Sequence, residues 1–161
     1  MKKCIFFICA ILLFLTGQIS AQNQKEVAYP DVPRVSAHEA YVKFKAGNAI
    51  IIHAGGEAFE NRHIWGAINI PEEAVSQGKM KPPNFPKAGV EIFTYCYWGP
   101  QESAGASLAH YMIERGYENV KTVDGGGAAM EKVFDYYKKT YYGGKIINPR
   151  TGKVLEIKSQ K

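Results

Sequence analysis

Residues 92–116 read IFTYCYWGPQESAGASLAHYMIERG, and this stretch decides the fold class. The apolar run over 90–95 is typical of a buried strand. The segment over 101–115 has the apolar spacing of a helix, and Gly116 ends it. A strand, a tight loop and a helix form the repeating unit of open α/β sheets, in which ligands bind beyond the carboxyl ends of the strands. Cys96 is therefore predicted to lie at a ligand-binding edge of such a sheet.

The alternation of strands and helices continues on both sides of this stretch. Further elements are predicted as strands over 49–52, 67–70 and 120–123, helices over 36–47 and 128–137, and single helical turns over 57–61 and near residue 73. Ser36 and Glu39 form a capping box for the first helix. We therefore predict an α/β fold with a mainly parallel central sheet, helices on both faces and a small C-terminal β-hairpin around residues 148–152.

The first residues have the layout of a secretory signal peptide. Lys2 and Lys3 precede an apolar run of 11 residues, Ile5–Leu15, and Ile19-Ser20-Ala21 resembles a small-x-small cleavage site. The alternative is a membrane anchor, but a spanning helix needs about 20 apolar residues. We expect an exported protein, periplasmic or extracellular, with no stable membrane insertion after cleavage. The predicted organisation is a signal peptide over 1–21, a linker over 22–34, a folded domain over 35–140 and a C-terminal hairpin or tail over 141–161.

Cleavage after Ala21 removes Cys4 and Cys9, so Cys96 becomes the sole cysteine of the mature chain. No intrachain disulfide is then possible. A single unpaired cysteine is either a buried small apolar residue or a working thiol, and its position alone leaves both open. The free amides and the dipole of the following helix would stabilise an anion beside Cys96, including a thiolate or a persulfide.

Charge and histidine content argue against two other classes of protein. The chain carries 20 Lys and Arg residues against 15 Asp and Glu residues, and loss of Lys2 and Lys3 leaves a net charge of +3. This excess is too weak and too dispersed to indicate nucleic-acid binding. His53 and His63, taken with Cys96, match no zinc-binding pattern, so no metal site is predicted. His53 ends a predicted strand and is a candidate neighbour of Cys96.

Four stretches in order resemble the rhodanese-like (sulfurtransferase) domain family. Residues 63–71, HIWGAINIP, are similar to a signature of that family, and residues 95–116 are similar to its catalytic loop and following helix. Residues 115–120, RGYENV, and residues 124–126, DGG, are similar to two later turns of the family. The resemblance spans residues 35–133, and it implies that His63 has a structural role in the first signature.

The resemblance implies a mechanism in which Cys96 is the catalytic nucleophile. Its thiolate takes sulfur from a sulfane sulfur donor, becomes a persulfide and passes that sulfur to a thiol-type acceptor, either a small molecule or a protein. No cofactor is implied, and His53 and His63 are possible supporting residues. Pro100 offers no N–H group to the anion. The implied substrate-binding loop comprises Tyr97, Trp98, Gly99, Pro100, Gln101 and Glu102.

The chain departs from the family pattern around this loop. Gln101 replaces the arginine that helps to hold anionic donors, and Glu102 replaces a serine or threonine. Glu102 opposes a thiosulfate dianion if it faces the loop, or complements the helix dipole if it points outward. His53, Gly55 and Met130 stand where the family commonly has aspartate, arginine and tryptophan. We therefore expect a site that is not optimised for thiosulfate.

These residues bear on three candidate functions. The first is sulfur transfer through a Cys96 persulfide, with Tyr97 and Trp98 as an exposed aromatic rim and Tyr95 in the sheet core. The alternative is a non-catalytic binding or regulatory module that keeps the fold. A phosphatase of the related Cys-x5-Arg type would need arginine at position 102, where the Glu102 carboxylate opposes phosphoryl transfer. The intact cysteine in a matching loop favours the enzyme.

Overall fold

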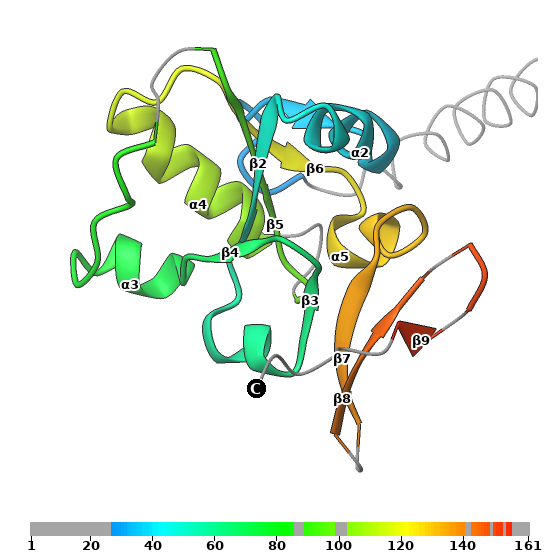
Figure 1. The fold of residues 1–161 in the computed structure, drawn as a ribbon. Coiled ribbons are helices and arrows are strands. Elements are labelled where there is room, and N and C mark those ends of the chain that lie inside the picture. Colours follow the sequence, from blue (N-terminus) through cyan, green and yellow to red (C-terminus); the bar gives the residue numbers. More distant parts are fainter. Residues whose placement is uncertain are drawn as a thin grey trace, which may run out of the picture.

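Five short parallel strands form the centre of the molecule (Figure 1). The computed structural model describes residues 27–85, 89–98, 103–140, 143–148, 150–152 and 154–155. The sheet has the order β1-β6-β5-β2-β4, and β5 and β2 at its middle are almost fully buried because helices cover both faces. The strands are β1 (Arg34–Val35), β2 (Ala49–His53), β4 (Ile68–Asn69), β5 (Glu91–Tyr95) and β6 (Val120–Val123).

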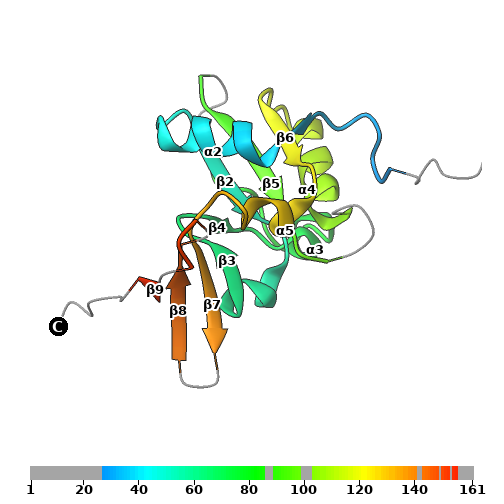
Figure 2. The same cartoon turned by 90° about the vertical axis from the view of Figure 1, so that its right-hand side faces the viewer.

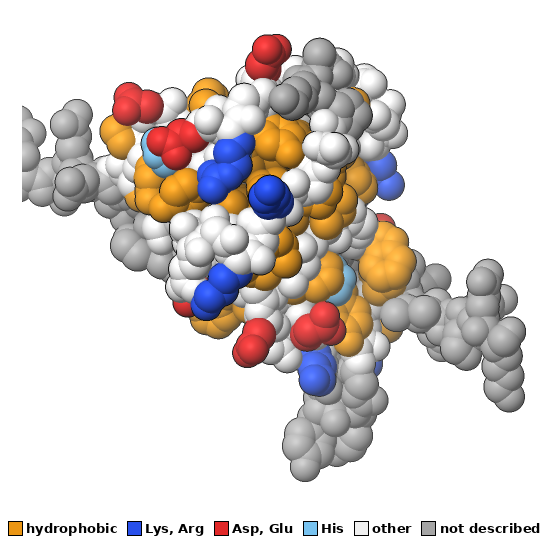
Figure 3. Space-filling view, turned by 90° about the vertical axis from the view of Figure 1, so that its left-hand side faces the viewer, with side chains coloured by type: hydrophobic (Ala, Val, Ile, Leu, Met, Phe, Trp, Pro, Cys, Tyr) orange, Lys and Arg blue, Asp and Glu red, His pale blue; other side chains and the backbone are white. Residues whose placement is uncertain are grey.

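Two layers of helices bury alternate residues of these strands in separate apolar clusters. The helices are α2 (Ala37–Lys45), the 3-10 helix η2 (Gly56–Glu60), α3 (Glu72–Ser76), α4 (Ser103–Glu114) and α5 (Gly126–Met130). On the side of α3 and α4, Leu108 shares a cluster with Ile52. On the side of α2 and α5, Met130 shares a cluster with Ile51. Acidic, basic and apolar side chains are interspersed on the outer surface of the α3 and α4 side (Figure 3).

A second, antiparallel sheet extends away from the main one (Figure 2). The Tyr95 hydroxyl at the end of β5 accepts a hydrogen bond from the N–H group of Ile64, with 2.8 Å between the two atoms. This buried bond joins the two sheets. The strands of the second sheet, in the order β3-β7-β8-β9, are β3 (Arg62–Ile64), β7 (Tyr136–Thr140), β8 (Gly143–Ile147) and β9 (Val154–Leu155).

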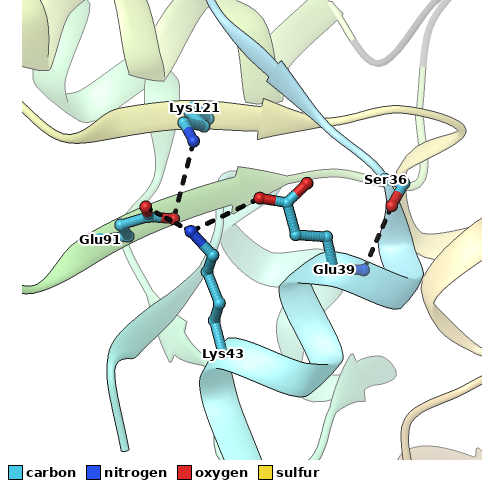
Figure 4. A network of polar contacts seen from close by, with 5 residues as sticks. All are labelled: Ser36, Glu39, Lys43, Glu91 and Lys121. Carbon is cyan, nitrogen blue, oxygen red and sulfur yellow. Dashed lines mark hydrogen bonds and ion pairs between the residues drawn. The ribbon is translucent and has the colours of Figure 1, made fainter. Parts of the chain in front are cut away.

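Charged side chains tie α2 to the amino ends of β5 and β6 (Figure 4). Lys43 Nζ lies 2.6 Å from one carboxylate oxygen of Glu91 and 3.5 Å from Glu39. Lys121 Nζ lies 3.7 Å from the second oxygen of Glu91. The Ser36 hydroxyl accepts the N–H group of Glu39 over 3.2 Å, as the predicted helix start requires. This network lies at the opposite end of β5 from Cys96, so it fixes α2 without contacting the loop.

The structure confirms the α/β class, the parallel central sheet and the C-terminal hairpin. The strands predicted over 49–52 and 120–123 are β2 and β6, and the helix predicted over 36–47 contains α2. The run over 90–95 contains β5, and the segment over 101–115 contains α4. The hairpin consists of β8 and β9, whose Ile147 and Val154 lie opposite each other.

The helix predicted over 128–137 is right for its first residues, which belong to α5, and wrong beyond Met130. α5 ends at Met130, and β7 begins at Tyr136. Tyr136 pairs with Ile64 of β3 on one side and with Ile147 of β8 on the other. Aromatic residues fit a pleated sheet, and pairing on both sides outweighs the local helical spacing. β3 is a second difference, because no strand is predicted over residues 62–64.

Residues within the predicted linker over 22–34 pack into the domain. Val32 is only 3% exposed, and Arg34 belongs to β1, which pairs with β6. The predicted signal peptide over 1–21 lies outside the described residues. In the part of the chain that the structure describes, none of the helices has the length and apolar character needed to cross a membrane.

Candidate functional site

Cys96 follows β5 directly, at the carboxyl edge of the parallel sheet. Its side chain is buried, with 1% of its surface exposed, and joins the apolar cluster that contains Ala54 and Leu108. The thiol donates a hydrogen bond to the backbone carbonyl of Trp98, with 3.2 Å between sulfur and oxygen. The Cys96 carbonyl accepts the N–H group of Gly127 over 2.9 Å. The cysteine is thus held at the predicted edge, but with its sulfur covered.

Helix α4 approaches the end of β5 closely enough to fix the start of this loop. The Thr94 hydroxyl donates to the carbonyl of Gly105 over 2.8 Å. A Cβ atom on Gly105 would lie 3.1 Å from Cα of Tyr95 and 3.1 Å from the hydroxyl of Thr122. The absence of a side chain at Gly105 therefore lets the first turns of α4 lie directly on the sheet beside Cys96.

Tyr97 is anchored on the opposite side of the sheet from the Cys96 thiol. Its ring lies on the bare backbone of Gly127, where an added Cβ atom would come within 2.2 Å of the ring. Its hydroxyl donates to a carboxylate oxygen of Glu131 over 2.9 Å. Burial raises the pKa of Tyr97 well above its ordinary value. The expectation that Tyr97 is exposed is wrong, because this side chain fills the space above Gly127, whereas Trp98 is 61% exposed as expected.

Arg62 completes the anchor of Tyr97 from the second sheet. Its guanidinium pairs with both carboxylate oxygens of Glu131, and its carbon Cζ lies 4.8 Å from the centre of the Tyr97 ring. The hydrogen bond with Glu131 raises the pKa of Arg62. We call Arg62, Tyr97, Gly127 and Glu131 the Tyr97 anchor. It connects the loop after β5 to α5 and to β3 at once.

His53 is fully buried at the end of β2, next to Tyr95 of β5. Its ring centre lies 5.0 Å from that of Tyr95 and 5.7 Å from that of Tyr97. Successive strand residues point to opposite faces, so His53 shares a face with Tyr95 whereas the Cys96 side chain lies on the other face. His53 therefore does not face the thiol as a base would need to.

The His53 imidazole is neutral near pH 7. Its Nδ1 accepts the N–H group of Gly55 over 3.1 Å, so the ring proton is on Nε2. Burial, with a smaller effect from the nearby His63, lowers the pKa of His53 to about 4. The side chain of Asn69 partly offsets this fall in the pKa of His53, and both Nε2 of His53 and Oδ1 of Asn69 are buried.

His63 occupies a structural position. Its Nδ1 lies 2.7 Å from the carbonyl oxygen of Phe59, and its ring stacks on Phe59 with 3.9 Å between centres. On its other side it stacks on Tyr137 of β7 at 5.0 Å. His63 thereby links η2, β3 and β7, in keeping with the structural role that the sequence resemblance implies.

Two pockets flank the loop, one on each side of the sheet. One, of about 580 Å³, is lined by residues of the β2–η2 connection, α3 and the start of α4, among them Glu57, Glu72 and Lys79. The other, of about 440 Å³, lies beside Tyr97 and Trp98. We call this second one the loop pocket; it is lined by Ala58, Asn61, Arg62, Tyr97, Trp98, Ala128, Lys138 and Lys139.

Four of the predicted loop residues, Gly99, Pro100, Gln101 and Glu102, lie outside the described residues. Over the described ranges, no three His, Cys, Asp or Glu side chains lie close enough together to hold a metal ion. Arg62 and Glu131 are functional neighbours that no sequence pattern indicates, because they are 69 positions apart. The sequence does contain a clue to Gly127, since this residue extends the Asp124-Gly125-Gly126 turn by one further glycine.

This chain matches one family model and resembles several solved structures. A family model described as the rhodanese-like domain matches residues 36–132. A solved rhodanese-like domain from Anabaena sp. has 17% identity and a TM-score of 0.52, over 80% of this chain and 89% of that one. A Bacillus halodurans protein has 18% identity and a TM-score of 0.52, over 94% of each chain. The human single-domain sulfurtransferase TSTD1 has 19% identity and a TM-score of 0.50, over 60% of this chain and 93% of that one. At these identities the likeness to solved structures supports the fold alone.

The contact between Tyr97 and Gly127 can be tested by a double-mutant cycle. Gly127→Ala places a Cβ atom 2.2 Å from the Tyr97 ring, so we expect a loss of roughly 2 kcal/mol in the free energy of unfolding. In a Tyr97→Ala background the clash is gone and alanine favours the helix, so the same change should be neutral or slightly stabilising. Urea denaturation measures all four proteins. Equal losses in both backgrounds would show that Tyr97 does not set the requirement for glycine.

The buried His53 predicts a loss of stability in acid. The unfolded chain protonates this histidine near pH 6.5, whereas the folded protein does so only near pH 4. The contribution of neutral His53 to the free energy of unfolding is therefore fully present above pH 6.5. It falls, by up to about 3 kcal/mol, as the pH drops towards 4. His53→Gln should flatten this part of the curve of unfolding free energy against pH, measured with urea. His38→Gln, at an exposed position of α2, is the matched control. A slope that is unchanged in His53→Gln would contradict the assignment.

Proposed function

The chain belongs to the rhodanese-like domain family, and we propose that it transfers sulfane sulfur through a persulfide on Cys96. The observation that carries this proposal is the position of Cys96. It is the only cysteine among the described residues, lies within the family match and follows β5 at the carboxyl edge of the sheet, where ligands of α/β sheets bind.

The proposed reaction consists of two displacements at sulfur. The Cys96 thiolate attacks the outer sulfur of a donor, the donor's own bond to that sulfur breaks, and the rest of the donor leaves with the electron pair. A thiolate acceptor then attacks the outer sulfur of the Cys96 persulfide. The sulfur–sulfur bond at Cys96 breaks, and Cys96 recovers its thiolate. The two steps balance without an external oxidant, reductant or cofactor.

The first displacement requires the loop to move. In the resting protein the thiol proton is shared with the Trp98 carbonyl, and the sulfur is covered. A thiolate has no proton to donate, so Cys96 must lose this contact when it ionises. The N–H group of Gly127 holds the Cys96 carbonyl and so fixes the backbone on one side of the thiol while the Trp98 carbonyl turns away from it.

The residues after the cysteine disfavour thiosulfate as the donor. Gln101 supplies no positive charge, and Glu102 adds a negative charge at the next position in the sequence. A doubly charged inorganic anion therefore gains less binding free energy from this loop than from a loop that contains arginine. We propose a less charged, organic or protein-bound sulfane donor and a thiol-type acceptor.

The cellular location is also a proposal. The basic start at Lys2 and Lys3, followed by the apolar run Ile5–Leu15, supports export of the protein through a signal peptide. Sulfur transfer would then take place in the periplasm or outside the cell.

The second candidate is a non-catalytic binding module with the same fold. The observation that favours it is the burial of Cys96, which as a whole residue has 1% of its surface exposed. Free cysteine often behaves as a small apolar residue in a core. The two candidates differ in a single property, which is whether Cys96 accepts sulfur from any donor.

Kinetics with three proteins test the proposed reaction. The wild type should transfer sulfur to a thiol from an organic persulfide faster than from thiosulfate, and Cys96→Ser should transfer none from either. Gln101→Arg should raise the rate with thiosulfate about tenfold, because a charge-assisted hydrogen bond contributes about 1.5 kcal/mol or more. The rate with an uncharged donor serves as the internal control.

Two outcomes would overturn these assignments. Transfer that is unchanged in Cys96→Ser would remove the nucleophile from the mechanism. A Gln101→Arg protein that gains nothing with thiosulfate would show that the missing arginine does not determine the choice of donor.

A further inference from the structure

The pocket of about 580 Å³ lies on the same side of the sheet as the Cys96 thiol, and we call it the thiol-side pocket. Segments that follow the carboxyl ends of β2 and β4 line it, together with Ala104 at the start of α4. Ala54 and Ala104 of its lining pack in the apolar cluster that contains Cys96. Ligands of α/β sheets bind beyond such strand ends, and the volume suits an organic molecule. This pocket is therefore the approach to Cys96 for the proposed sulfur donor.

Residues 54–57, which connect β2 to η2, form one wall of the thiol-side pocket. Two side chains from the neighbouring strands β2 and β4 hold this wall (Figure 1). His53 and Asn69 lie beside each other in the register of these strands. Nδ1 of His53 accepts the N–H group of Gly55 over 3.1 Å, and Nδ2 of Asn69 donates to the carbonyl of Gly56 over 3.0 Å. Neither side chain lines the pocket itself, so both act on the wall from behind.

The ring of His53 also determines which residue fits at position 55. A Cβ atom on Gly55 would lie 2.5 Å from Cε1 of His53 and 3.3 Å from each ring nitrogen. The ring cannot easily give way, because it is fully buried, with its centre 5.0 Å from that of Tyr95 and 5.6 Å from that of Phe59. Histidine at position 53 therefore requires glycine at position 55. The two departures from the family pattern at these positions are thus one coupled change.

We propose that His53 is a positioning residue for the sulfur donor, which acts through Gly55 on the wall of the thiol-side pocket. Gly55 and Gly56 have no side chains, so their backbone is fixed only by the groups that contact it. The imidazole supplies the acceptor for the Gly55 N–H group and keeps the wall in the conformation that receives the donor.

The role in donor binding rests on the proposed function, because the donor is that of the Cys96 reaction. The hold of His53 on Gly55 does not rest on it. His53 lies on the other side of the sheet from the thiol, so it affects how well the donor binds and not the displacement at sulfur.

Two variants of the same shape test the acceptor on its own. Asparagine and leucine have similar size and branching, but only asparagine places an acceptor oxygen where Nδ1 of His53 lies. The measurement is the rate at which the Cys96 persulfide forms, by mass spectrometry, against the concentration of the persulfide of N-acetylcysteine methyl ester. His53→Leu should raise the half-saturating concentration about fivefold and leave the maximal rate unchanged, as the loss of one neutral hydrogen bond implies. His53→Asn should restore the half-saturating concentration to that of the wild type.

Hydrogen exchange of the Gly55 N–H group gives a readout that needs no turnover. At pH 7, by NMR in D2O, this group should exchange about fivefold faster in His53→Leu than in the wild type or in His53→Asn. His38→Leu, at an exposed position of α2, is the control and should change neither readout. Thermal melting checks that each variant is folded. If His53→Leu does not fold, Asn69→Leu replaces it and should raise the half-saturating concentration in the same way.

The outcomes separate this proposal from the proposed function. Equal half-saturating concentrations in His53→Leu and His53→Asn, or equal exchange of the Gly55 N–H group in the two, would overturn the role of His53 while leaving the Cys96 reaction intact. An unchanged half-saturating concentration in Asn69→Leu, where that variant is used, would count against the wall in the same way. Absence of the persulfide in every protein would overturn the proposed function and the donor's use of the pocket, whereas the exchange of Gly55 would still decide whether His53 holds the wall.

Discussion

The contact between the Tyr97 ring and the bare backbone of Gly127 is the constraint on which the site depends. It allows the Gly127 N–H group to reach the Cys96 carbonyl, which fixes the cysteine at the end of β5. It also directs the Tyr97 hydroxyl to Glu131, which in turn holds Arg62. A side chain at position 127 would displace the ring and with it the connection between the loop and the second sheet.

Strand alternation divides the surroundings of the loop into two environments. The Cys96 thiol lies with the apolar cluster on the side of α3 and α4, whereas Tyr95, Tyr97 and His53 lie on the side of α2 and α5. The ring of His53 belongs to an aromatic group that supports Tyr97 from beneath. A cysteine and a histidine that end neighbouring strands are thus separated by the sheet itself. Any proton acceptor for Cys96 must come from elsewhere.

The parts of the fold that could be predicted are those in which local pattern and tertiary environment agree. Ala49–His53 and Val120–Val123 are β-branched runs in central strands, and Cys96 directly follows such a run. The register Tyr136↔Ile147 could not be predicted, because residues 128–137 carry helical spacing and the strand exists only through its two partners. The pairing of Arg62 with Glu131 could not be predicted either, since two short elements far apart in sequence bring these residues together.

The central claim is that the buried Cys96 sulfur accepts a sulfur atom. Its most direct test is intact-mass and peptide mass spectrometry of the purified protein after exposure to an organic persulfide and to thiosulfate. We expect a gain of about 32 Da, the mass of one sulfur atom, on the peptide that contains Cys96, and its loss after addition of a thiol. Absence of this gain with every donor tested, in a folded protein, would contradict the claim and leave the fold as a binding module.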